Sequence, residues 1–246
     1  VERDIERLRR QFNEKFKDKT VIEKDVVLAK EDEKDTLSID TVGGKIADFN
    51  TNGTLNSRKY AKNNIVFLID VSGSMDKPEK LPYLKKAVYE MVRVLRKDDL
   101  VTIITYAGKV NTLLVGMPGD EKESIYKIID GLEAKGNSYG TEGMNIAYEN
   151  ARSNFIKGGN NQVILVSDVL FNSEDFSPKK LFKLSKYQVD NFGIITSCIG
   201  FGKNEDAINF MKGLASNGNG SFIKILYESD AESALVAEIM KHSAIQ

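Results

Sequence analysis

The stretch of residues 64–78, NIVFLIDVSGSMDKP, decides the fold of this chain. Its first half is an uninterrupted apolar run rich in β-branched residues, which is typical of a strand buried on both faces of a parallel sheet. The run stops at Asp70, and Ser72 and Ser74 follow at alternate positions. Ligands of open parallel sheets bind beyond the carboxyl ends of the strands. The sequence therefore predicts a central strand that leads directly into a binding site.

Strand-like and helical patterns alternate from residue 63 onward. Further apolar runs predict strands at residues 100–107, 110–115, 162–168, 193–201 and 220–226. Amphipathic patterns predict helices at residues 81–97, 122–134, 143–156, 178–191, 205–216 and 231–242. Such alternation is typical of an α/β fold. We expect a doubly wound, mainly parallel six-stranded sheet with helices on both faces and with 110–115 as an edge strand.

Residues 1–60 follow a different pattern. Near the start, four apolar residues stand three or four positions apart among charged residues: Ile5, Leu8, Phe12 and Phe16. On a helix they would form one stripe. The stripe predicts an amphipathic helix that docks on the rest of the chain or, alternatively, on a partner. Short strands are expected at 20–29 and on both sides of a hairpin turn at Gly43 and Gly44. We therefore expect an N-terminal amphipathic helix and β-hairpin segment over 1–60, and the α/β domain over 61–246.

Composition excludes several classes of function. The 246 residues include 35 basic and 36 acidic side chains, which leave a net charge of −1 and no basic excess for nucleic-acid binding. No apolar run approaches the roughly 20 residues that a transmembrane helix needs, so we expect no membrane span in this chain. The only cysteine, Cys198, lies within an apolar strand and is expected to be a core thiol.

The oxygen-bearing residues after the first strand indicate a metal site. Asp70, Ser72 and Ser74 offer one carboxylate and two hydroxyls, hard donors that suit magnesium or manganese and are poor ligands for zinc or copper. A structural alternative is that Asp76 and its neighbours cap the next helix. Capping requires one such residue, whereas here three follow a buried strand at strict alternation. The metal interpretation is therefore favoured.

Two other segments can supply further oxygen ligands. The strand at 162–168 ends in Asp168, so its carboxylate is expected at the same sheet edge as Asp70. The loop before the helix at 143–156 contains the hydroxyls of Ser138 and Thr141. Together with the first three residues these side chains could surround one cation.

The segment FLIDVSGSMD resembles the metal-ion-dependent adhesion site of the von Willebrand factor A domain family, whose signature is Asp-x-Ser-x-Ser. The resemblance covers roughly residue 63 to the C-terminus. It implies a Rossmann-like sheet with the strand order 3-2-1-4-5-6 and one antiparallel edge strand. Asp70, Ser72 and Ser74 match the signature fully. The segments LVTIITYAGKVNTLL and LEAKGNSYGTEGMNIAYENA are further similar to a bacterial branch of cell-envelope proteins, which implies an envelope, periplasmic or extracellular location.

The resemblance also implies two more ligand positions. The family's loop hydroxyl, usually Thr, corresponds to Ser138, with Thr141 as the alternative. The acid after the fourth main strand corresponds to Asp168, although Val169 replaces the glycine that commonly follows it in this branch.

These ligands imply a cation-dependent binding function. Magnesium, with manganese or calcium as alternatives, would be bound with only Asp70 and Asp168 contributing negative charge. If one acid acts through water, the ion keeps excess positive charge and attracts an Asp or Glu of a protein partner. We therefore expect a non-catalytic adhesion-type module. The alternative is a structural scaffold in which the metal only stabilises the loops.

The enzymatic alternative is a serine hydrolase. Residues 136–140, GNSYG, fit the Gly-x-Ser-x-Gly motif, and Ser138, Asp168 and His242 follow the chain order of serine hydrolases. That motif requires a preceding strand, whereas 122–134 predicts a helix. His242 is expected to be a surface or capping residue. A phosphotransferase of the haloacid dehalogenase type would need an acid where Ser72 stands.

Two weaker motifs favour ordinary turns. Residues 48–59 place Asp48 and Asn52 as in a calcium loop, but Lys59 stands where the bidentate acid belongs. The segment around Lys203 lacks the spacing of a phosphate-binding loop and predicts a strand-to-helix turn.

Overall fold

The computed structural model describes residues 36–41, 45–50, 52–136, 141–170 and 177–245. The predicted N-terminal helix with its apolar stripe, the strand at 20–29 and Ser138 lie outside the described residues. None of the described helices is long and apolar enough to cross a bilayer.

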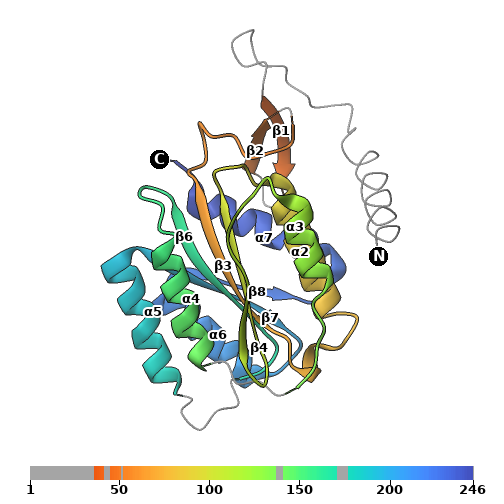
Figure 1. The fold of residues 1–246 in the computed structure, drawn as a ribbon, viewed down its shortest axis with the longest axis vertical. Coiled ribbons are helices and arrows are strands. Elements are labelled where there is room, and N and C mark those ends of the chain that lie inside the picture. Colours follow the sequence, from red (N-terminus) through yellow and green to blue (C-terminus); the bar gives the residue numbers. More distant parts are fainter. Residues whose placement is uncertain (1–35, 42–44, 51, 137–140, 171–176, 246) are drawn as a thin grey trace.

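The main sheet has six strands in the order β5-β4-β3-β6-β7-β8 (Figure 1). Their bounds are β3 Asn63–Asp70, β4 Leu100–Tyr106, β5 Val110–Pro118, β6 Asn160–Ser167, β7 Ile194–Phe201 and β8 Asn219–Ile225. All neighbouring pairs are parallel except β4 and β5, which are antiparallel. This is the expected doubly wound order with one antiparallel edge strand, so the predicted fold class is confirmed.

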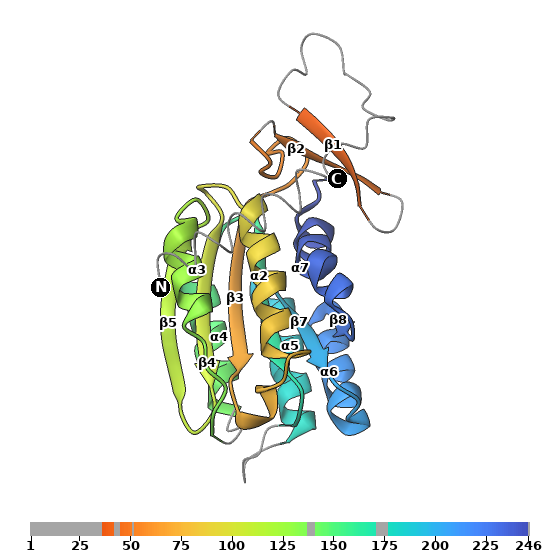
Figure 2. The same cartoon turned by 90° about the vertical axis from the view of Figure 1, so that its right-hand side faces the viewer.

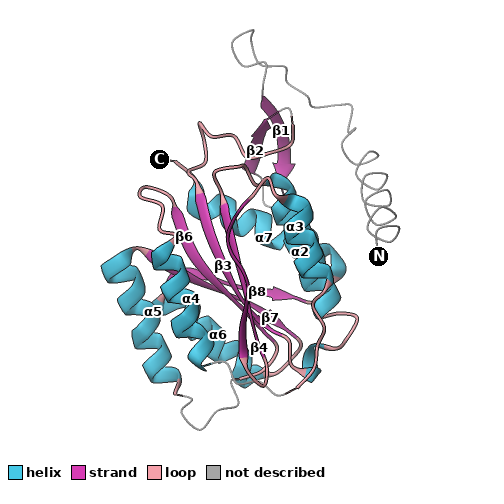
Figure 3. Cartoon of the chain, viewed as in Figure 1, coloured by secondary structure: helices cyan, strands magenta, loops and turns pink. Residues whose placement is uncertain are grey.

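Helices cover both faces of this sheet (Figure 3). Their bounds are α2 Leu81–Val94, α3 Lys122–Asp130, α4 Thr141–Ser153, α5 Pro178–Phe192, α6 Glu205–Asn217 and α7 Glu228–Ser243. Buried residues of α2, α3 and α7 share one hydrophobic core, whereas those of α4, α5 and α6 share the core on the opposite face. Figure 1 shows the two helix layers on either side of the sheet.

Strand β3 lies at the centre because both of its faces are apolar. Ile65 and Phe67 belong to the core under α2 and α7, whereas Val66 and Leu68 belong to the core under α4. Every residue of β3 is buried, as the continuous apolar run predicts. Its carboxyl end therefore emerges at the middle of the sheet edge, between β4 and β6.

A separate hairpin precedes this domain. Strands β1 Thr36–Thr41 and β2 Lys45–Asn50 pair antiparallel around the predicted turn. Figure 2 shows the hairpin beyond the end of the main sheet at which β3 begins. Phe49 at its end and Leu55 form an isolated bridge, and both are buried in the domain core. The boundary that we place at residue 60 stays a prediction.

The chain segments just before β3 and just after α7 lie side by side. Tyr60 and Ala244 form an antiparallel bridge. The amide of Ala61 donates to the Ser243 carbonyl at 2.7 Å, and the amide of Ile245 donates to the Lys59 carbonyl at 2.8 Å. We call these two segments, residues 59–61 and 243–245, the terminal seam.

Candidate metal centre

Asp70 is held rigidly at the carboxyl end of β3. The side chain is fully buried. Its Oδ1 accepts a hydrogen bond from the Ser72 amide at 2.8 Å, and its Oδ2 accepts one from the Ser167 hydroxyl at 2.9 Å. The first bond turns the chain sharply after the strand, because a carboxylate that bonds its own backbone two residues on stabilises a turn.

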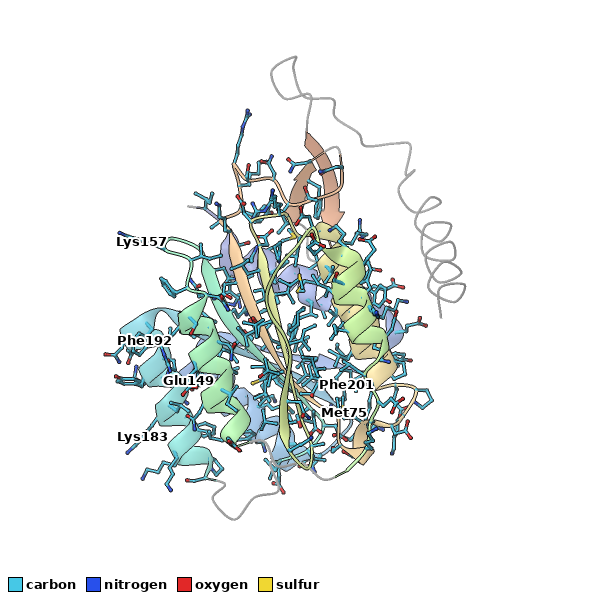
Figure 4. The ribbon with its side chains drawn as sticks, in the orientation of Figure 1. Met75, Glu149, Lys157, Lys183, Phe192 and Phe201 are labelled. Carbon is cyan, nitrogen blue, oxygen red and sulfur yellow. The ribbon has the colours of Figure 1, made fainter. Side chains whose placement is uncertain are left out.

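The two signature serines lie in that turn. Residues Gly73–Met75 form a single turn of 3₁₀ helix. The Ser72 and Ser74 hydroxyl oxygens are 3.1 Å apart, and the Ser74 hydroxyl donates to Oδ1 of Asp168 at 2.8 Å. The Met75 side chain is fully buried in the same hydrophobic core as Phe201, and Figure 4 labels both residues. This burial holds the turn against the domain. The hydroxyls therefore gather on one side of the loop.

Asp76 does not cap the following helix, so the structural alternative for this segment is wrong. The helix α2 begins only at Leu81, and the residue before it, Lys80, makes no side-chain cap. Asp76 is exposed in the intervening loop.

Asp168 joins this group from the neighbouring strand. It follows β6 directly, and its side chain is 2% exposed. Strands β3 and β6 are parallel neighbours, so their carboxyl ends bring Asp70 and Asp168 to the same edge. Burial raises the pKa of the Asp70 carboxyl above its ordinary value, and the negative charge of Asp168 adds to this, although hydrogen bonds from Ser72 and Ser167 oppose it.

Lys80 is a member of the site that sequence reasoning missed. Its ammonium group forms an ion pair with Oδ2 of Asp168 and donates to the Ser74 carbonyl at 2.9 Å. The lysine follows the signature by six residues in a loop, and no spacing rule connects it to Asp168. Only the folded geometry reveals the contact.

Two further neighbours were also missed. Ser167 binds Asp70 across the β3–β6 pair, and Tyr106 lies opposite Asp70 in the β3–β4 register. Burial raises the pKa of the Tyr106 phenol well above its ordinary value, and the nearby Asp70 charge raises it further. Each residue lies one position before the end of a predicted strand, so the alignment of strand ends could have placed both beside Asp70.

The loop that would supply the hydroxyl of Ser138 or Thr141 is described only in part. Thr141 begins α4, but its side chain, like Ser138, lies outside the described residues. The preceding loop does contact the signature turn. The Gly73 amide donates to the Gly136 carbonyl at 3.0 Å, and the Lys135 amide donates to the Val71 carbonyl at 2.7 Å. The assignment of Ser138, with Thr141 as the alternative, stays a prediction.

His242 does not lie near Asp168, so the described residues do not form a Ser138–Asp168–His242 triad. Its Nε2 lies 3.0 Å from Oε1 of Glu238, and that carboxylate accepts from Gln162 near the start of β6. Asp168 follows the other end of the same strand. His242 lies in the last turn of α7, but it is not a surface residue, because its side chain is only 11% exposed against Glu238.

The two weaker motifs are turns, as predicted. Residues 50–54 close a turn in which the Asn50 amide donates to the Thr54 carbonyl at 2.7 Å, with Gly53 at a φ of 80°. Lys203 lies between the end of β7 and the start of α6.

Acids, histidines and cysteines do not form a three-membered metal cluster anywhere in the described part of the chain. A cation at this edge would therefore depend on serine hydroxyls as well as on Asp70 and Asp168. Carboxylate and hydroxyl oxygens are the donors that magnesium and calcium prefer. Here such oxygens lie within hydrogen-bonding distance of one another, and the ammonium group of Lys80 lies beside them.

The sheet order and the polar edge above β3 and β6 define a doubly wound α/β domain with its site at the strand switch point. Residues 65–171 match the profile of the von Willebrand factor type A domain. This part of the chain belongs to that family.

Similar proteins come from several sources. An "Uncharacterized protein YfbK" of Escherichia coli is 36% identical over 183 residues, which cover 74% of this chain and 32% of that protein. A crystal structure of an aerotolerance-related membrane protein from Bacteroides fragilis covers 73% of this chain and 99% of that chain, with a TM-score of 0.56 and 17% identity. A structure of proximal thread matrix protein 1 from the mussel byssus, described with a zinc-occupied MIDAS motif, covers 74% of this chain and 46% of that chain, with a TM-score of 0.57 and 18% identity. This chain thus spans about a third of the length of YfbK.

Proposed function

We propose that this chain is a divalent-cation-dependent protein-binding module. A magnesium ion would be held by Asp70, Ser72, Ser74 and Asp168, with a hydroxyl from Ser138 or, alternatively, Thr141. An Asp or Glu side chain of a partner protein would complete the coordination. The observation that carries this proposal is the buried Asp70 carboxylate, aligned by two hydrogen bonds beside two hydroxyls and a second acid.

The charge balance of the site supports a binding role. Asp70 is fully buried, and burial raises the pKa of its carboxyl, so ionising this group costs free energy. A bound cation would stabilise the ionised form. Asp168 is already bound by Ser74 and Lys80, which leaves Asp70 as the main direct source of charge. A bound divalent ion would then retain positive charge and favour an incoming carboxylate. One such contact can anchor an interface, because charge-assisted ligation is strong and directional.

Family membership supports the general role, since the profile match covers the signature turn and Asp168. The structure of the mussel protein, with its zinc-occupied site, illustrates that a domain of this fold can bind a divalent ion. The likeness to a bacterial membrane protein agrees with a location in the cell envelope, which we retain as part of the proposal.

A structural scaffold is the second candidate. The observation that favours it is the ion pair between Lys80 and Asp168, which satisfies part of the site without any metal. The two candidates differ in whether a partner carboxylate reaches the ion.

The test combines metal binding with partner binding. Calorimetric titration with Mg²⁺ or Mn²⁺ should show one site in the native chain and none in Asp70→Ala. Asp76→Ala, which removes an exposed acid from the same loop, is the matched control and should bind normally. A pull-down from native extract should recover a partner in magnesium but not in EDTA, with folding unchanged by circular dichroism. Metal binding without any cation-dependent capture would favour the scaffold, and equal affinity in Asp70→Ala would refute the site.

A further inference from the structure

We propose that Lys80 is an internal cation that competes with the divalent ion for Asp168. In this arrangement, which rests on the proposed function, the ammonium group neutralises Asp168 in the metal-free protein. It must leave that carboxylate when the metal binds. Lys80 therefore lowers the affinity of the site for metal and stabilises the metal-free state.

The first support is the burial of the pair. The side chains of Lys80 and Asp168 are 10% and 2% exposed. Lysine is almost never buried to this degree unless it is paired. An ion pair shielded from water interacts much more strongly than one on the surface, where screening and side-chain entropy remove most of the gain.

The second support is that the Lys80 side chain plays no part in starting helix α2. Its backbone amide donates to the Lys77 carbonyl, and its carbonyl accepts from the Leu84 amide, so the backbone alone starts α2. The side chain makes no cap on that helix. It extends instead to the polar edge of the sheet, where both of its acceptors belong to the proposed metal site.

The third support is that the ammonium group binds a carboxylate that a metal ion would also need as a ligand. It binds Oδ2 of Asp168, while Oδ1 of the same carboxylate accepts from Ser74. Both oxygens of Asp168 are therefore engaged. A divalent ion beside this carboxylate would also lie close to the ammonium group, and two positive charges at such short range repel strongly in a buried site.

The residue beside the Lys80 stem is a glycine. Gly202, at the end of β7, has a φ of 77°, and a Cβ atom at that position would lie 3.9 Å from Cε of Lys80. A side chain at residue 202 would therefore pack against the lysine stem. The four-carbon stem of lysine is flexible, so its ammonium group can exchange Asp168 for solvent at the rim of the site.

The experiment measures Mn²⁺ affinity by titration calorimetry in the native chain and in Lys80→Met, which keeps the stem and removes the charge. Lys77→Met, an exposed lysine of the same loop, is the matched control. We expect at least about tenfold tighter binding in Lys80→Met and no change in Lys77→Met. We also expect Lys80→Met to melt at a lower temperature in EDTA and to gain more from Mn²⁺ than the native chain, because its Asp168 has lost its buried partner.

A double-mutant cycle identifies the group over which the cations compete. The gain in affinity should disappear when Lys80→Met is combined with Asp168→Asn. Should Lys80→Met not fold, Lys80→Gln serves the same purpose. In the native chain, ¹⁵N NMR of the lysine ammonium groups should show a slowly exchanging Lys80 signal that is lost when Mg²⁺ is added.

The outcomes separate this inference from the proposed function. Equal or weaker Mn²⁺ affinity in Lys80→Met, with binding by the native chain intact, overturns the competition and leaves the metal site standing. A gain that survives Asp168→Asn also overturns it. Binding by neither protein overturns both proposals. Binding by Lys80→Met alone supports the competition, and metal binding without partner capture contradicts only the adhesion role.

Discussion

The Ser167 hydroxyl lies 2.9 Å from Oδ2 of Asp70, across the parallel pair formed by β6 and β3. This contact fixes one oxygen of the carboxylate, while the Ser72 amide fixes the other. Groups that orient a metal ligand in this way commonly affect metal affinity 10- to 100-fold, roughly, when removed.

We therefore predict that Ser167→Ala weakens Mn²⁺ binding about tenfold while leaving the fold intact. The measurement is calorimetric titration, with circular dichroism as the check on folding. Ser153→Ala, an exposed serine of α4, is the control and should bind as the native chain does. Unchanged affinity in Ser167→Ala would show that Asp70 is not oriented by this hydroxyl.

Asp70→Asn should abolish divalent binding and raise the melting temperature of the metal-free protein. The reason is that burial disfavours the charged carboxylate, as the raised pKa of Asp70 indicates, whereas a neutral amide avoids that penalty and can still accept from the Ser72 amide. Thermal unfolding in EDTA and in Mg²⁺ measures both effects. A lower melting temperature of the variant in EDTA would contradict this explanation.

Glu90 should make the protein less stable as the pH rises. This residue of α2 is buried, and burial raises its pKa to about 7, although Arg93 opposes the shift. The folded state therefore holds a proton that the unfolded state has lost, so stability falls between about pH 4.5 and pH 7. We predict that Glu90→Gln stabilises the chain by about 1–3 kcal/mol at pH 8 and far less at pH 5. Urea unfolding at both pH values tests this.

The control for that prediction is Glu149→Gln, an exposed glutamate of α4 that is labelled in Figure 4. It should change stability little at either pH. An equal effect of Glu90→Gln at pH 5 and pH 8 would show that the ionisation of Glu90 is not responsible.

Glu238 should act in the opposite direction. Burial would raise its pKa, but hydrogen bonds from His242 and Ser197 outweigh burial and lower it to about 2. Its contribution is therefore present above about pH 4.5 and is lost as the pH falls toward 2. We predict that Glu238→Gln destabilises the chain by about 2–3 kcal/mol at pH 7 and loses this difference at acidic pH. Acid titration followed by circular dichroism would reveal it, and a pH-independent difference would count against it.

The sheet could be predicted from the sequence because its signals are local and consistent. The continuous apolar run of β3 specified a central strand. The strand β5, which was predicted as an edge, has no buried residue. Asp70 and Asp168 could be placed at one edge because parallel strands end together. None of this required knowledge of side-chain contacts.

The remaining features depend on contacts between distant residues. Lys80 reaches Asp168 over 88 positions, and no periodicity encodes that contact. His242 was expected at the surface because isolated histidines usually lie there, but Glu238 binds it within the helix. The acid is buried because Ser197 and Gln162, on two different strands, also donate to it. Such partners become visible only when the topology is known.

The terminal seam has a mechanical consequence. Residues 59–61 and 243–245 lie beside the start of β3, whereas Asp70 ends that strand roughly 25 Å away at about 3.3 Å per residue. A pulling force applied at Lys59 and Ile245 would load the backbone hydrogen bonds of the terminal seam first. The loops around Asp70, at the opposite end of β3, would not carry this force directly, so a ligand bound there could stay in place while the seam is loaded.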